Sequence, residues 1–148
     1  MRNAKCAPPI AKSGSMISKT CSIRVRYADT DQMGVVYYSR YLEWFEVGRT
    51  EYLRALGWPY RRMEEEGVFL PVVEAHVQYH RSTHYDDLVQ VRTRIGEMSG
   101  VRLKIECEVW REGELLASGY TVHAFLNGDG KPIRPSKVFV EALKQNEQ

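Results

Sequence analysis

The feature that most constrains this fold is a period of two in hydrophobicity, which runs through residues 72–126. Turn-forming pairs interrupt it at 86–87, 99–100 and 112–113, so the pattern predicts four consecutive antiparallel strands in a meander. The side chains expected to share apolar faces are, strand by strand, Val73, Ala75, Val77 and Tyr79; Val89, Val91, Thr93 and Ile95; Val101, Leu103, Ile105, Cys107 and Val109; and Leu116, Tyr120, Val122, Ala124 and Leu126.

A fifth strand and one long helix are predicted before this region. Residues 21–27 alternate between apolar and basic side chains, as a half-buried strand does. Residues 38–56 carry apolar side chains at helical spacing, and a glycine followed by a proline ends the segment. Gly48 lies inside this helix, where glycine costs about 1 kcal/mol relative to alanine. We therefore expect the helix to lie very close to the sheet at Gly48.

These elements predict one α+β domain over residues 21–148, in which a single amphipathic helix packs across a five-stranded antiparallel sheet. A short polar helix or loop is expected within residues 60–70, and a C-terminal helix from Ser136, its cap, to about residue 146. Residues 1–20 hold four basic residues and no acidic one, and are predicted to be a flexible extension. The uncovered sheet face and edge strands favour a homo-oligomer.

Composition argues against several classes of protein. The 148 residues contain no apolar run long enough for a membrane span, and the first twenty lack the apolar core of a signal peptide. Beyond residue 20 there are 17 basic and 19 acidic residues, which is not the charge of a nucleic-acid-binding protein. Three widely spaced cysteines (Cys6, Cys21 and Cys107) argue against a disulfide framework. We therefore expect a cytoplasmic protein.

The most informative motif is an eighteen-residue stretch from Tyr27 to Trp44, which reads Y-A-D-T-D-Q-M-G-V-V-Y-Y-S-R-Y-L-E-W. It passes from a strand through an acidic turn into the start of the long helix, so it places a carboxylate beside unpaired backbone N–H groups. In one interpretation Asp29 and Asp31 only cap the turn and the helix. In the other, Asp31 activates water or attacks a carbonyl, buried against aromatic side chains, while the N–H groups hold the oxyanion.

Other motif interpretations fit less well. A calcium loop starting at Asp29 would place Met33 and Arg40 at two ligand positions. Three histidines (His76, His80 and His84) are four residues apart, but the first two fall in strand-patterned sequence, so a zinc site is not expected. The chain contains neither a glycine-rich phosphate-binding motif nor a G-x-S-x-G nucleophile motif. No metal site is predicted.

The stretch R-Y-A-D-T-D-Q-M-G-V-V-Y-Y-S-R-Y-L-E-W-F-E resembles the signature of the 4-hydroxybenzoyl-CoA thioesterase family, and most closely that of its YbgC-like, Tol–Pal-linked branch. Weaker matches follow in V-V-E-A-H-V-Q-Y-H-R-S-T-H-Y-D-D-L-V-Q-V and K-P-I-R-P-S, so the resemblance covers residues 22–139. It implies a hotdog fold, in which a five-stranded antiparallel sheet wraps a long helix. It also implies homodimers or homotetramers with active sites at the dimer interface, and no metal or redox cofactor.

The resemblance also implies roles for individual residues. Asp31 would be the nucleophile or general base of thioester hydrolysis, and the backbone N–H of Tyr38 the oxyanion donor. Many YbgC-like proteins have histidine at the position of Tyr38, so we leave the acyl group open between short-chain and aromatic. The residues expected to bind substrate are Gly34, which would let the turn pack closely, Val36, Tyr37, Glu46 against the acyl group, and His80, Arg81 and Arg102 near the CoA phosphates.

The sequence therefore predicts an acyl-CoA thioesterase, in which CoA is part of the substrate and no further cofactor is needed. An acyl carrier protein is the alternative carrier of the acyl group. A non-catalytic acyl-CoA-binding or scaffold module on the same fold is the second hypothesis, which would not require a carboxylate at Asp31. A hotdog hydratase ranks last, because the helix segment lacks the expected His–Asp pair.

Overall fold

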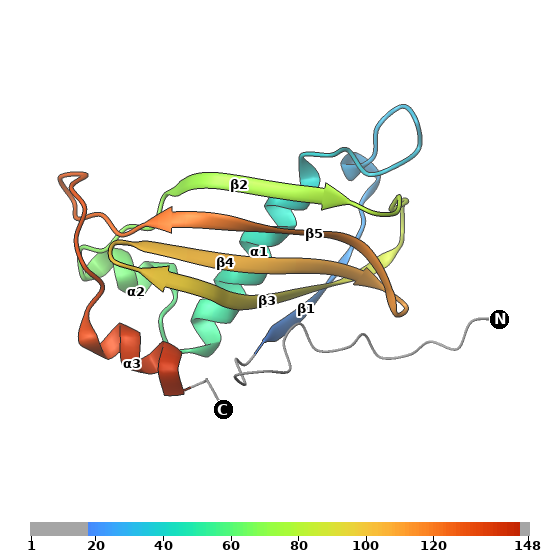
Figure 1. Cartoon of the computed structure of the whole chain (residues 1–148). Helices are drawn as coiled ribbons and strands as arrows, with labels where there is room; N and C mark the ends of the chain where they lie inside the picture. The colour runs from blue at the N-terminus through green and yellow to red at the C-terminus, as the bar shows by residue number, and fades with distance from the viewer. Residues whose placement is uncertain (1–17, 146–148) are drawn as a thin grey trace.

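The computed structural model describes residues 18–145. The elements, in chain order, are β1 (Lys19–Arg24), the 3-10 turn η1 (Tyr27–Asp29), α1 (Arg40–Ala55), α2 (Tyr60–Glu65), β2 (Val72–Tyr79), β3 (Leu88–Ser99), β4 (Arg102–Arg111), β5 (Glu114–Ala124) and α3 (Lys137–Gln145). The five strands form one antiparallel sheet, and α1 lies across one of its faces (Figure 1). This α+β arrangement is the hotdog fold that the resemblance implies.

The loop between β1 and α1 lies at the end of the sheet where β2 finishes, and α2 and α3 lie at the opposite end (Figure 1). The predicted helices agree with this structure to within two residues at the ends of α1 and α3. The backbone N–H of Phe139 donates to the Ser136 hydroxyl at 3.2 Å, which confirms Ser136 as the cap of α3. Among the described residues, no helix has the length and apolar character needed to cross a bilayer.

Helix α1 buries an apolar stripe against the sheet, with Phe45 and Leu53 both at 0% exposure. The stripe follows the helical spacing read from the sequence. Gly48 lies in this stripe, and a Cβ atom added to it would come within 3.0 Å of the Thr93 hydroxyl and the Val91 side chain on β3. The close approach predicted at Gly48 is therefore confirmed.

The predicted meander is wrong in one respect. The order across the sheet is β1-β3-β4-β5-β2, so β3, β4 and β5 form a meander but β2 pairs with β5 rather than with β3. Strand β1 takes the place beside β3, from Lys19 opposite Thr93 to Arg24 opposite Leu88. Alternation identifies the faces of a strand but not its neighbours, so the sequence pattern did not distinguish these two orders.

Strand β5 also differs from the prediction, because its buried face is the other one. Ala117, Thr121 and His123 point into the core. Of the predicted face only Leu116 is fully buried, whereas Tyr120 and Val122 are half-buried. Tyr120 lies on the outer face, where the Lys104 ammonium sits 4.2 Å from its ring centroid. The apolar residues of β5 therefore indicated the wrong face, since its buried face carries two polar side chains.

Strand β2 is an edge strand and is more exposed than its alternation predicted. Val73 is 50% exposed and Tyr79 46%, and only Val77 of the predicted face packs partly against the core. The prediction that β2 buries one apolar face is therefore wrong for this single chain. At the other edge, β1 begins at Lys19, two residues before the predicted strand. Residues 1–17 of the predicted extension lie outside the described residues.

His123 gives the fold a pH-sensitive group. Its ring is fully buried, with Nδ1 3.0 Å from the Leu70 carbonyl oxygen and Nε2 2.8 Å from the Thr121 hydroxyl. Burial lowers the pKa of His123 from 6.5 to about 4, although the bond to Leu70 favours protonation and the charge of Arg49 opposes it. In the folded chain the imidazole is therefore neutral at pH 7, and Nδ1–H donates to the carbonyl.

Stability should consequently fall as the pH drops from 6.5 to 4. In that window the unfolded chain takes up a proton on His123 that the folded chain does not, which removes up to about 3 kcal/mol of stability. Urea unfolding of wild type and His123→Gln between pH 7.5 and 4 measures this difference, and the variant should show the shallower dependence. Equal slopes in the two proteins would contradict the assignment.

Candidate functional site

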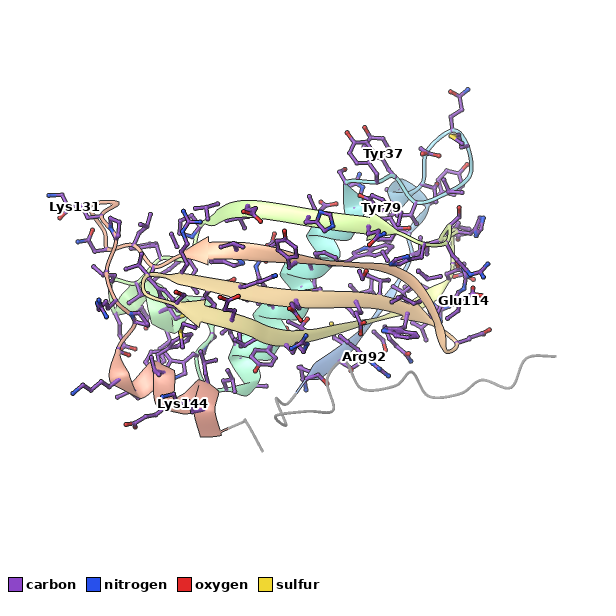
Figure 2. The ribbon with its side chains drawn as sticks, viewed as in Figure 1. Tyr37, Tyr79, Arg92, Glu114, Lys131 and Lys144 are labelled. Carbon is purple, nitrogen blue, oxygen red and sulfur yellow. The ribbon has the colours of Figure 1, made fainter. Side chains whose placement is uncertain are left out.

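A cavity of about 330 Å³ opens at the end of the sheet where β2 finishes. It lies between the Asp31 turn, the start of α1, the end of β2 and the segment that follows β2. Its lining residues are Asp31, Val35, Val36, Tyr37, Tyr38, Tyr41, Tyr79, His80, Arg81 and Ser82. Figure 2 shows Tyr37 and Tyr79 together at this end of the molecule, far from Lys131 at the other. Six of the nine predicted site residues are thus brought together.

The turn holds Asp31 in a defined position. Its N–H donates to the Val35 carbonyl at 2.9 Å, and its own carbonyl accepts the Gly34 N–H at 3.0 Å. Carboxylate oxygen Oδ1 accepts the Met33 N–H at 2.9 Å, whereas Oδ2 has no hydrogen-bond partner among residues 18–145. Gly34 has φ +81° and open space where a Cβ would lie, so the turn needs its conformational freedom rather than the close packing that was expected.

Asp29 has a different role, because its side chain is only 3% exposed. It accepts hydrogen bonds from the N–H and the guanidinium of Arg26, and the Arg40 guanidinium lies 3.8 Å away. Burial by itself would raise the pKa of Asp29, but the Arg26 hydrogen bonds and the two positive charges outweigh it and lower the pKa. The backbone carbonyl of Asp29 accepts the Tyr37 N–H at 2.9 Å. Both aspartates therefore cap backbone N–H groups of this segment, and of the two only Asp31 also lines the cavity.

The backbone directs one N–H group away from the helix at this position. The Tyr37 carbonyl accepts the Arg40 N–H at 3.0 Å, so it points along α1. The peptide between Tyr37 and Tyr38 is trans and planar, which makes the Tyr38 N–H point the opposite way. This N–H has no hydrogen-bond partner within the described part of the chain. A free backbone donor and the Asp31 carboxylate thus belong to residues that line one cavity.

The aromatic surroundings of Asp31 differ from the expectation. Tyr37 and Tyr38 pack with their ring centroids 4.6 Å apart, but they are 43% and 63% exposed. Trp44 belongs to the core and is absent from the cavity lining. Asp31 is accordingly half-buried rather than enclosed. The Tyr38 hydroxyl, and to a smaller extent burial and the charge of Asp31, raise the pKa of Tyr37.

His80 and Arg81 form the rim of the cavity opposite the turn. Both backbone N–H groups donate to the Leu116 carbonyl of β5, at 2.8 and 3.0 Å. The His80 ring bonds the Ser118 hydroxyl at 2.9 Å, and the Arg81 guanidinium pairs with Glu114 at 3.3 Å. The Arg81 side chain remains 60% exposed despite this pair, so its guanidinium is accessible to a molecule at the cavity.

Three predicted residues lie elsewhere. Gly34 shapes the turn without lining the cavity, and Glu46 lines a second cavity of about 550 Å³ together with Arg49 and Tyr60. Arg102 is the first residue of β4, at the end of the sheet opposite the Asp31 turn. Within one chain, neither Glu46 nor Arg102 can contact a molecule confined to the Asp31 cavity.

The structure also reveals contributors that the sequence did not indicate. The Tyr41 and Thr83 hydroxyls are 2.9 Å apart and buried, and the Thr83 carbonyl accepts the Val36 N–H at 2.8 Å. The Tyr79 hydroxyl donates to the Tyr38 carbonyl at 2.8 Å. These bonds join segments about forty residues apart in the sequence. No local sequence pattern identifies such partners.

The three histidines considered for zinc have separate surroundings. His76 stacks on Tyr120 with 5.3 Å between ring centroids, and His84 Nδ1 lies 4.0 Å from the Asp87 carboxylate. The described residues contain no group of three or more histidine, cysteine or acidic side chains arranged to hold a metal ion.

Comparison with known proteins places this chain in a family. The thioesterase-like superfamily matches residues 25–143. YneP of Bacillus subtilis is 39% identical over 79% of this chain and 86% of its own length, and the acyl-CoA thioesterase YbgC of Haemophilus influenzae is 36% identical over 75% and 83%. The DHNA-CoA thioesterase of Staphylococcus aureus superposes with a TM-score of 0.83 at 37% identity, covering 88% of this chain and 91% of that one. The chain therefore belongs to the thioesterase-like superfamily, among the YbgC-like thioester hydrolases.

Proposed function

We propose that this protein hydrolyses acyl-CoA thioesters in the Asp31 cavity. One observation carries the proposal: the Asp31 carboxylate and the unpaired Tyr38 N–H belong to residues that line the same cavity. Thioester hydrolysis needs a base or nucleophile on one side of a carbonyl and a hydrogen-bond donor at its oxygen. The family relationship supports the same chemistry.

The reaction follows from these two groups. Carboxylate oxygen Oδ2 of Asp31 removes a proton from water as the water attacks the thioester carbon, while the Tyr38 N–H stabilises the negative charge on the carbonyl oxygen. When the tetrahedral intermediate collapses, the C–S bond breaks and the proton passes from Asp31 to the leaving sulfur. In the alternative mechanism, Asp31 itself attacks the thioester carbon, the C–S bond breaks and the CoA thiolate leaves, so that a mixed anhydride remains. Water then cleaves the anhydride and regenerates the Asp31 carboxylate. A thiolate is a good leaving group, so a strong acid at the sulfur is not required.

The rim of the cavity fits the CoA part of the substrate. The exposed Arg81 guanidinium can donate to a phosphate group, and His80 lies beside it. We propose that these two residues bind the diphosphate of CoA. If an acyl carrier protein carries the acyl group instead, they would bind the phosphate of its phosphopantetheine arm. Tyr37 and Tyr38 offer aromatic surface near the thioester, which suits a short aliphatic or an aromatic acyl group.

We further propose that two chains pair through β2. This edge strand is eight residues long and carries exposed apolar side chains, including Val72 and Val73. Such an edge is normally covered, and an antiparallel β2–β2 pairing around a two-fold axis covers it. Sedimentation equilibrium of the full chain should then give an even multiple of the chain mass. A monomer at micromolar concentration would contradict this arrangement.

This pairing gives Glu46 a place in the site. The Asp31 cavity lies at the Tyr79 end of β2, and the second cavity, which includes Leu70 and Pro71, lies at its other end. Antiparallel pairing therefore sets the Asp31 cavity of one copy beside the second cavity of the other. The acyl group would extend into that second cavity, toward Glu46. Within a single chain, the two cavities lie at opposite ends of β2 and are therefore about 26 Å apart.

The test of the proposed function is release of free thiol from a panel of acyl-CoA thioesters, ranging from short aliphatic to long aliphatic and aromatic. Hydrolysis above the uncatalysed rate is the expected result, and the largest kcat/KM identifies the acyl class. Acyl-phosphopantetheine in parallel shows whether the nucleotide end contributes to KM. Binding of acyl-CoA without turnover of any member would instead support the non-catalytic binding module.

A further inference from the structure

A hydrogen bond from β2 restrains Tyr38, which lines the cavity and whose backbone N–H is unpaired among the described residues. The Tyr79 hydroxyl, on the last residue of β2, donates to the Tyr38 carbonyl at 2.8 Å. Tyr38 precedes Ser39, the residue before α1, and lies outside the regular helix. Its carbonyl is therefore held by a side chain from another element, 41 residues away in the sequence.

The peptide that carries the Tyr38 N–H is fixed on both sides. Before it, the Tyr37 N–H donates to the Asp29 carbonyl at 2.9 Å and the Tyr37 carbonyl accepts the Arg40 N–H at 3.0 Å. After it, the Tyr79 hydroxyl fixes the Tyr38 carbonyl. The Tyr37–Arg40 bond spans Tyr38 and already limits its φ and ψ angles, but it lies at the end of the helix, where backbone bonds fray. Tyr79 adds a second restraint, which comes from outside the helix.

Tyr79 is itself held in place. Its ring packs edge-to-face on Tyr41, with 5.0 Å between centroids and 80° between ring planes. The Tyr41 hydroxyl is 2.9 Å from that of Thr83, and the Thr83 carbonyl accepts the Val36 N–H. The contacts therefore run from β2 through α1 to the segment beside the Asp31 turn. A rigid support of this kind is what a hydrogen-bond donor for a developing oxyanion requires.

We infer that Tyr79 is a positioning residue, whose hydroxyl orients Tyr38 so that its N–H meets the oxyanion formed during thioester hydrolysis. The inference rests on the proposed function and assigns Tyr79 no contact with the reacting atoms. A misplaced oxyanion donor stabilises the transition state less well, while the binding of the substrate changes little. Removal of the hydroxyl should therefore affect kcat rather than KM.

The test is Tyr79→Phe, which keeps the ring against Tyr41 and removes only the hydroxyl. We expect kcat for the best acyl-CoA to fall about 10-fold, with KM within about twofold of wild type. The melting temperature, the elution volume on gel filtration and the shape of the pH–rate profile should stay as in wild type. Tyr85→Phe is the matched control, because Tyr85 packs its exposed ring on Tyr27 and does not line the cavity.

Binding of two analogues separates positioning from structure. A ketone analogue of the acyl-CoA forms a tetrahedral adduct, so its affinity for Tyr79→Phe should be lower than for wild type by about the same factor as kcat. A thioether analogue has no carbonyl and should bind both proteins with equal affinity. Equal kcat values, or a loss that follows a lowered melting temperature, would overturn the inference. So would a changed basic limb of the pH–rate profile, which would make the hydroxyl a proton donor. Failure of wild type to hydrolyse any thioester would instead overturn the proposed function.

Discussion

Replacing Asp31 with asparagine should lower kcat for thioester hydrolysis about 100-fold or more. The substitution is nearly isosteric, and the amide oxygen can still accept the Met33 N–H that Oδ1 accepts in wild type. The turn should therefore keep its shape. What disappears is the negative charge, and with it the ability of Oδ2 to take a proton from water or to attack the carbonyl. KM should change little, because His80 and Arg81, which we propose to bind CoA, are untouched.

The measurement is free-thiol release by wild type and Asp31→Asn over a range of substrate concentrations. Asp86→Asn is the matched control, since it removes one carboxylate charge from the loop before β3 but does not line the cavity. Its kcat should be within about twofold of wild type, as expected for a surface substitution outside the site. Equal rates for wild type and Asp31→Asn would exclude Asp31 as base or nucleophile.

A large effect on stability is expected at Gly48. In an open helix, Gly48→Ala would stabilise the chain by about 1 kcal/mol. Here the new Cβ would come within 3.0 Å of Thr93 and Val91, two short β-branched side chains that cannot easily move away. Overpacking of this kind should outweigh helix propensity and lower the free energy of unfolding by about 1–3 kcal/mol, and Gly48→Val should lower it further.

Urea unfolding of Gly48→Ala measures this cost. Val47→Ala, one residue away and 44% exposed in wild type, is the matched control and should change stability by less than about 0.5 kcal/mol. Combining Gly48→Ala with Thr93→Ala removes the hydroxyl that the Cβ meets, so the two changes should not add. A Gly48→Ala protein more stable than wild type would show that the sheet can shift to make room.

Local sequence patterns predicted most elements of this fold. Helical spacing located α1, and the unfavourable Gly48 within it correctly predicted a close approach to the sheet. Alternation identified β3 and β4 together with their buried faces. The order strand, acidic turn, helix also indicated where a carboxylate and backbone N–H groups would meet. These features depend on residues close together in the sequence, whose spacing reflects which side chains face the core.

Long-range pairing was decided only by the tertiary structure. Strand β2 lies beside β5 because β3 already has β1 and β4 as neighbours, and no periodicity within a strand encodes such a choice. The buried face of β5 contains Thr121 and His123, whose polar atoms find partners in each other and in the Leu70 carbonyl, 53 residues from His123. The Tyr79–Tyr38 bond likewise exists only when β2 ends beside α1. The sequence by itself determined the elements and the Asp31 turn, because both are local. The tertiary structure decided the strand order, the polar core contacts and the Tyr79–Tyr38 hydrogen bond, because each joins groups whose separation along the chain leaves no local pattern.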